Sequence, residues 1–133
     1  METTEVTRRS NDEHIYLSLL HLGAVMWSSS SKRLMLALQY VDKNQSITDG
    51  PVKCLYAELA SAQKCTYSVI ERSLRYAIRR VWMRRHDDCA QLLYHSSSVE
   101  HCPSPSEFIC LYSAALQHGT IQAWVDSHEI SFM

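Results

Sequence analysis

The sequence predicts an all-α protein: a compact bundle of about six helices that contains a helix-turn-helix. Apolar residues recur at helical spacing through most of the chain, and no segment alternates convincingly enough to be a strand. Only three glycines and three prolines occur in 133 residues, which disfavours a β-sandwich or barrel with its many turns. The length and an ordinary globular composition, with 46% hydrophobic and 20% charged residues, suit one domain with a single core.

The first two helices follow a polar start. Residues 1–11 are expected to form a disordered tail, and the first helix spans residues 12–22, with Gly23 as a plausible stop. The serine run at 28–31 reads as a short loop whose last residues can cap a second helix, which ends near residues 42–44. The apolar stripes of these two helices are formed by Ile15, Leu19 and Leu22, and by Leu34, Leu38 and Val41.

Two further helices meet at a tight break. The turn at 48–51 ends in Pro51, which is well placed to open a helix over residues 52–63. A short break at 63–66 then leads into the longest predicted helix, over about residues 67–85. Two alternative N-caps for this helix are Thr66, or Ser68 in a capping box with Glu71.

The last third of the chain contains one clear helix start. A short helix over 87–93 and a loop over 95–103 come first. The segment 104–107 then combines an N-cap serine, a proline at the first helical position and a glutamate at the third, and the helix stops at Gly119. We expect a helical domain over residues 12–118, and a C-terminal tail over residues 119–133 that adds a turn of helix or stays loose.

Positive charge is concentrated in one segment. The whole chain has a formal net charge of -1, which alone argues against a polyanionic partner. Residues 64–85 nevertheless hold seven basic residues and one acidic residue, whereas the rest of the chain holds six basic and 13 acidic residues. This cationic island on an otherwise acidic protein indicates a local site for a negatively charged partner.

The helix predicted over 67–85 has two opposite faces. At roughly 100° per residue, five apolar residues fall on one arc about 100° wide: Ile70, Leu74, Ala77, Ile78 and Val81. The opposite side carries Ser68, Arg72, Arg75 and Arg79. Like charges three or four residues apart repel by a few tenths of a kcal/mol, so this row of arginines lowers the stability of the helix. The row therefore indicates a negatively charged partner. For Arg84 and Arg85, simple complementation of the helix C-terminus is the stronger interpretation.

A helix of about ten residues, a tight break and a second helix with a polar first turn form a helix-turn-helix, whose second helix enters the major groove of DNA. Arginine can donate two hydrogen bonds to guanine, and glutamate can accept one from cytosine. The residues predicted to read bases are Ser68, Glu71, Arg72 and Arg75. Those predicted to contact the DNA backbone are Lys64, Thr66, Tyr67, Arg79 and Arg80.

Three segments carry a family resemblance. They are residues 56–60 (YAELA), residues 70–78 (IERSLRYAI) with Val81-Trp82 after them, and residues 103–109 (PSPSEFI). Through them the sequence resembles the C-terminal effector domain of stage zero sporulation protein A, over about residues 14–117.

The resemblance implies a six-helix fold with a helix-turn-helix that binds double-stranded DNA at a short asymmetric box of TGTCGAA type, often in tandem copies. It also implies base-reading roles for Glu71, Arg72 and Arg75, while Val69 stands where the family commonly has an arginine. The family's full-length member carries an N-terminal receiver domain with a phosphorylated aspartate. A chain of 133 residues leaves no room for one, so control by direct phosphorylation is not expected.

Other classes of site are disfavoured. No apolar run approaches the ~18 residues of a membrane span, and the N-terminus lacks a secretory signal, so a cytoplasmic protein without a membrane partner is expected. The five cysteines form no CxxC pair, and His86, Cys89, His101 and Cys102 lack the spacing of a zinc site, so neither a metal nor a cofactor is expected. No catalytic residue is predicted, because no spacing resembles a nucleophile elbow, a phosphate loop or paired carboxylates.

Two functional hypotheses remain. The first is a transcriptional regulator, monomeric in solution and pairing on DNA, that activates by touching the RNA polymerase sigma factor through residues 82–93. The aligned arginines favour it. The second is a protein-interaction module that pairs with a full-length, receiver-containing regulator and modulates it, which the acidic remainder of the chain and Val69 favour.

Overall fold

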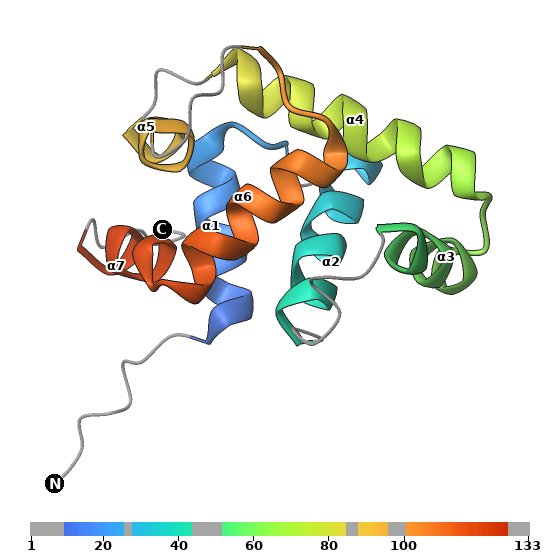
Figure 1. Ribbon diagram of the computed structural model, residues 1–133, viewed down its shortest axis with the longest axis horizontal. Helices are drawn as coiled ribbons and strands as arrows, with labels where there is room; N and C mark the ends of the chain where they lie inside the picture. The colour runs from blue at the N-terminus through green and yellow to red at the C-terminus, as the bar shows by residue number, and fades with distance from the viewer. Residues whose placement is uncertain (1–9, 26–27, 44–51, 85–87, 96–100, 128–133) are drawn as a thin grey trace, which may run out of the picture.

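The computed structural model describes residues 10–25, 28–43, 52–84, 88–95 and 101–127. This part of the chain forms seven α-helices and no strand, which confirms the predicted all-α class (Figure 1). The helices are α1 (Asn11–Leu22), α2 (Ser29–Lys43), α3 (Val52–Gln63), α4 (Tyr67–Met83), α5 (Asp88–His95), α6 (Pro105–Gln117) and α7 (Thr120–Ser127).

Helix α2 is the hub of the bundle, since it packs against α1, α3, α4 and α6. Helix α1 also contacts α5 and α7, and α6 contacts α4, α5 and α7. In Figure 1, α3 lies at one side of the molecule beside the N-terminal end of α4, and α7 lies at the opposite side. Helix α3 and the N-terminal end of α4 thus form one end of the molecule in this view, and α2 lies between α3 and α6.

The core contains all the apolar residues predicted for the stripes of α1 and α4. From the predicted stripe of α2 it contains Leu34 and Leu38, whereas Val41 is only partly buried. Each large apolar side chain that becomes fully buried contributes about 1.5–3 kcal/mol to folding, so together they fix the relative orientation of these helices. The largest fully buried side chains are Tyr112, Phe108, Ile15, Leu19, Leu22, Leu34, Leu38, Ile70, Leu74, Ile78, Leu93 and Ile121.

Capping residues explain where two of the helices begin. The predicted capping box of α6 is present: Ser104 Oγ accepts from the Glu107 backbone N–H at 3.2 Å, and Glu107 Oε1 accepts from the Ser104 N–H at 2.7 Å. The same arrangement links Ser10 and Glu13, so α1 begins at Asn11, inside the segment expected to be a tail. At the other end of α1, Gly23 adopts the left-handed conformation with φ 100°, as expected for a helix stop.

The C-terminal segment adds a helix to the core. Within the range 119–133, Thr120–Ser127 forms α7, whose Ile121 and Val125 are fully buried. Helix α4 ends at Met83, two residues before the predicted end at residue 85. The predicted turn at 48–51 lies outside the described residues. No helix within the described ranges is both long and apolar enough to cross a lipid bilayer.

Candidate nucleic-acid interface

The turn between α3 and α4 consists of three residues, and a lysine forms its bend. The Cys65 N–H donates to the Ala60 carbonyl at 3.0 Å, and the Lys64 N–H donates to the Ser61 carbonyl at 3.3 Å. These two bonds close α3 in the manner that usually requires glycine at the bend. Lys64 occupies that position with φ 56°, and its side chain is exposed.

Thr66 is the N-cap of α4. Its Oγ1 accepts from the Val69 backbone N–H at 3.2 Å, so the alternative capping box formed by Ser68 and Glu71 is wrong. Ser68 instead lies exposed within the first turn of the helix. Because this bond uses only a lone pair of Thr66, the hydroxyl hydrogen can still be donated to a phosphate oxygen.

The inner face of α4 is anchored as predicted. Its five apolar residues, at positions 70, 74, 77, 78 and 81, are each at most 1% exposed. They pack into the core, and α4 makes most of its contacts with α2, α3 and α6. Burial of this face fixes the rotation of α4 about its axis, and hence the direction in which its outer face points.

The outer face of α4 carries the predicted arginines. Arg72, Arg75, Arg79 and Arg80 are all exposed. In the described part of the chain, no carboxylate lies within ion-pairing distance of Arg72 or Arg79. The guanidinium groups of Arg72 and Arg79 therefore lie in solvent, and no carboxylate of the described residues neutralises their charge. Their contacts with DNA stay a prediction.

Arg75 differs from its neighbours, because its guanidinium pairs with Glu71 one turn earlier. The Arg75 Nε donates to Glu71 Oε2 at 3.1 Å, and a second N–H group of Arg75 donates to the same oxygen. The hydrogen bond to Glu71 is the main reason that the pKa of Arg75 is raised. The pair relieves the repulsion within the arginine row, and it places donors and an acceptor side by side on the outer face.

Tyr67 lies beside this pair and is partly held by α3. Its ring packs edge-on against Tyr56 with the centroids 5.0 Å apart, and 44% of Tyr67 remains exposed. Burial, followed by the nearby negative charge of Glu71, raises the pKa of Tyr56 to about 12. The aromatic contact thus fixes the first residue of α4 to the preceding helix, next to Glu71.

Arg33 on α2 is a residue of this region that the sequence did not indicate. Its Nη1 donates to Ser73 Oγ at 2.8 Å, and its Nε donates to Gln63 Oε1 at 3.3 Å. One side chain thereby joins α2 to the middle of α4 and to the last residue of α3. The periodicity of α2 places Arg33 beside its apolar stripe, but only the packing of the three helices shows what it bonds.

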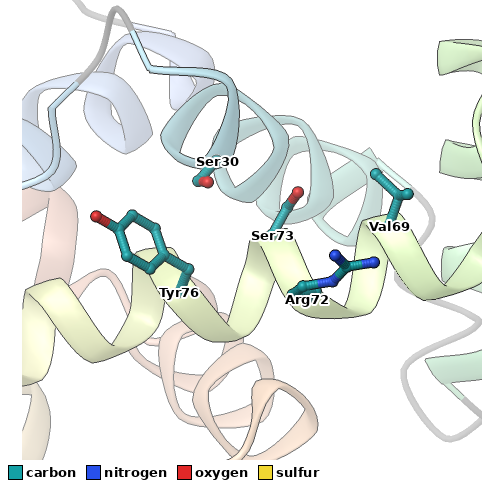
Figure 2. Close-up of a pocket in the computed structure, with 5 residues that line it drawn as sticks. All are labelled: Ser30, Val69, Arg72, Ser73 and Tyr76. Carbon is teal, nitrogen blue, oxygen red and sulfur yellow. The ribbon is translucent and has the colours of Figure 1, made fainter.

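A hollow lies between α2 and α4, next to this bridge. It is lined by Ser30 of α2 and by Val69, Arg72, Ser73 and Tyr76 of α4. Figure 2 shows the Ser73 hydroxyl pointing toward α2, with Arg72 and Tyr76 to either side of it. Val69 is one of the residues that line this hollow.

On the other side of α4, Cys102 lies near Arg75 and Arg79. Burial raises the pKa of the Cys102 thiol, while these two cations partly oppose the rise. Of the four side chains considered for a metal, Cys89 is fully buried and His86 lies outside the described residues. Nowhere in the described ranges do three metal-ligating side chains gather.

Two packed helices joined by a three-residue turn, the second exposing a row of arginines, define a helix-turn-helix domain. Residues 18–116 match the protein family described as sporulation initiation factor Spo0A C terminal, and the chain belongs to this family. The family is one of DNA-binding regulatory domains and not of enzymes. A search of curated proteins gives no match to the chain.

Proposed function

We propose that the protein is a cytoplasmic, sequence-specific transcriptional regulator that reads the major groove of double-stranded DNA with the first turns of α4. The observation that carries the proposal is the anchored inner face of α4 beneath exposed arginines. Such a helix meets DNA in a fixed orientation, which base recognition requires. The target is a box of TGTCGAA type, and the base-reading residues are Ser68, Glu71, Arg72 and Arg75.

The chemistry of these side chains suits a site that contains C·G pairs. Arginine donates two hydrogen bonds to guanine O6 and N7, while a glutamate accepts from cytosine N4. The Glu71–Arg75 pair presents both functions within one helical turn. Lys64, Thr66, Tyr67, Arg79 and Arg80 lie at the ends of this surface, where phosphates flank the groove.

The outcome of binding depends on further partners. DNA sites of this size usually need two copies for useful affinity, so a monomer that pairs on DNA is proposed. Activation would proceed through the RNA polymerase sigma factor and residues 82–93. In that segment Met83 is 72% exposed at the end of α4, whereas Trp82 packs edge-on against Tyr94.

A gel-shift titration with two substitutions tests base readout. Arg72→Ala should lower the affinity for a TGTCGAA-type duplex by about 1–3 kcal/mol and relax base preference. Lys64→Ala is the matched control, since loss of a phosphate contact should weaken specific and random duplexes similarly. Equal losses on both duplexes for Arg72→Ala would contradict base readout.

One observation favours the second candidate, a module that pairs with a receiver-containing regulator. Arg75 is already paired with Glu71 in the chain itself, which reduces the positive charge available to DNA. This function predicts weak DNA binding and co-purification with such a regulator. Failure to bind that partner would eliminate it.

A further inference from the structure

The guanidinium of Arg33 is bonded only to neutral oxygens within the described residues. Its two acceptors are the hydroxyl of Ser73 and the amide oxygen of Gln63, and no described carboxylate lies within ion-pairing distance. A guanidinium has five N–H donors, so these two bonds leave donors for another ligand. The side chain is only half-exposed, which makes an unbalanced positive charge unfavourable.

An anion would remove this imbalance, and a hollow is present on the neighbouring surface. The hollow lined by Ser30, Val69, Arg72, Ser73 and Tyr76 has a volume of about 270 Å³. Ser73, which Figure 2 shows in the lining of the hollow, also accepts the hydrogen bond from Arg33, so the hollow and the bridge are adjacent. Serine and tyrosine hydroxyls are donors that proteins commonly direct at DNA phosphates.

The position of the hollow matches the path of a DNA strand. It lies along the side of α4 that faces α2, while the outer face of α4 carries the arginines. When a recognition helix enters the major groove, the sugar-phosphate backbone passes along its flanks, where another helix can contact it. A phosphate on the α2 side would thus come close to both Ser30 and Arg33.

We infer that α2 supplies a binding site for one backbone phosphate of DNA, formed by Arg33 together with the hydroxyls of Ser30 and Ser73. The inference rests on the proposed function and adds to it a contact from outside the α3–α4 pair. Arg33 has two roles in this site: it contacts the phosphate, and through Ser73 and Gln63 it positions α4 relative to α3.

The test is a salt titration of the affinity of the full chain for a TGTCGAA-type duplex and for a random duplex of equal length. Arg33→Met removes the charge, Arg33→Gln removes it but keeps a group that can bond Ser73, and Arg33→Lys keeps it. Lys43→Met is the matched control, since Lys43 is an exposed cation of the same helix that pairs with Asp12. Urea unfolding of each variant reports its folding.

The loss of one phosphate contact reduces the slope of log K against log salt concentration by about 0.9. Arg33→Met and Arg33→Gln should each reduce the slope by this amount on both duplexes. Arg33→Gln, which keeps a group that can bond Ser73, should do so without changing the ratio of the two affinities. Arg33→Lys and Lys43→Met should keep the wild-type slope. If Arg33→Gln lowers the slope of log K against log salt concentration but unfolds in urea like the wild type, Arg33 contacts a phosphate and its role is not purely structural.

A second measurement locates the phosphate. In a series of duplexes, each carries one neutral methylphosphonate linkage at a different position. At one position the neutral linkage should lower the affinity of the wild type but leave the affinity of Arg33→Gln unchanged. If both neutral variants keep the wild-type slope, or if no linkage loses its effect in Arg33→Gln, the phosphate site is refuted while the proposed function stands. If the wild type binds neither duplex at any salt concentration, both are refuted.

Discussion

Lys64 forms the bend of the helix-turn-helix in a backbone conformation that glycine adopts more easily. With φ 56°, a residue that has a Cβ atom is strained by roughly 1 kcal/mol relative to glycine. The exposed ammonium at this bend lies close to the first turn of α4, where a DNA backbone contact is proposed. The proposed contact would explain a lysine where the fold alone would favour glycine.

This explanation predicts opposite effects on stability and binding. Lys64→Gly should raise the free energy of unfolding by about 1 kcal/mol, because it relieves the strained φ. It should also weaken binding to specific and random DNA equally. Lys64→Ala is the control: it removes the same charge but keeps the strain, so only the glycine variant should be more stable in urea denaturation. Equal stability of the two variants would contradict the backbone argument.

The proposed base-reading role of the Glu71–Arg75 pair predicts that the pair matters more for recognition than for folding. An exposed pair at this spacing stabilises a helix by only about 0.3–0.5 kcal/mol, so Glu71→Gln should change urea denaturation by no more than that. Without the carboxylate, the preference for cytosine at one base pair should fall, while affinity for random DNA should rise through the added net positive charge. Binding to duplexes varied at single positions measures both effects. An unchanged preference at every position would remove Glu71 from the base-reading set.

Helices that are specified by residues close together in the sequence, through apolar spacing or capping residues, were predictable from the sequence. The inner face of α4 follows from the spacing of its apolar residues, and the start of α6 follows from its serine, proline and glutamate. The outward direction of Arg72 and Arg79 follows from the same spacing. Such features depend on contacts within one or two helical turns.

Features that depend on packing between distant segments were not predictable. The bridge from Arg33 to Ser73 spans 40 residues, and no local pattern indicates it. Helix α7 has only eight residues, too few to show a clear apolar period, and it is stabilised by α1 and α6. Thr66 and Ser68 are both residue types that cap helices, so the sequence left them as alternatives. The geometry of the three-residue turn places Thr66 at the N-cap position.

The burial of α7 can be measured. Ile121→Ala should lower the free energy of unfolding by about 2–5 kcal/mol, because Ile121 is fully buried against the core. Ala123→Ser, an exposed position in the same helix, should change it by less than about 0.5 kcal/mol. Urea denaturation of both variants is the measurement. A similarly small effect for Ile121→Ala would mean that α7 is not part of the folded unit.

Buried tyrosines couple the stability of the whole fold to alkaline pH. Burial raises the pKa of Tyr56 to about 12 and raises that of Tyr112, whose hydroxyl is hydrogen-bonded to Ser18, further. Unfolded tyrosine ionises near pH 10, so above that pH the unfolded state binds fewer protons than the folded state. The free energy of unfolding should therefore fall above pH 10, by up to about 1.4 kcal/mol per pH unit for each tyrosine.

Substitution of one phenol tests this coupling. Tyr56→Phe should make the decline between pH 10 and pH 12 shallower by up to about 1.4 kcal/mol per pH unit, since one of the linked protons is gone. Urea denaturation at a series of pH values gives the slope. The same slope in wild type and Tyr56→Phe would show that Tyr56 ionises alike in both states.

The net charge of the chain is -1, so any attraction to DNA must come from the basic surface of α4 and its surroundings, not from the molecule as a whole. The most direct test is the affinity of the wild-type chain for a TGTCGAA-type duplex and for a scrambled duplex of the same composition, across a range of salt concentrations. Base recognition by α4 predicts tighter binding to the intact box at every salt concentration, with affinity for both duplexes falling as salt rises. Equal affinity for the two duplexes, or no binding to either, would contradict it.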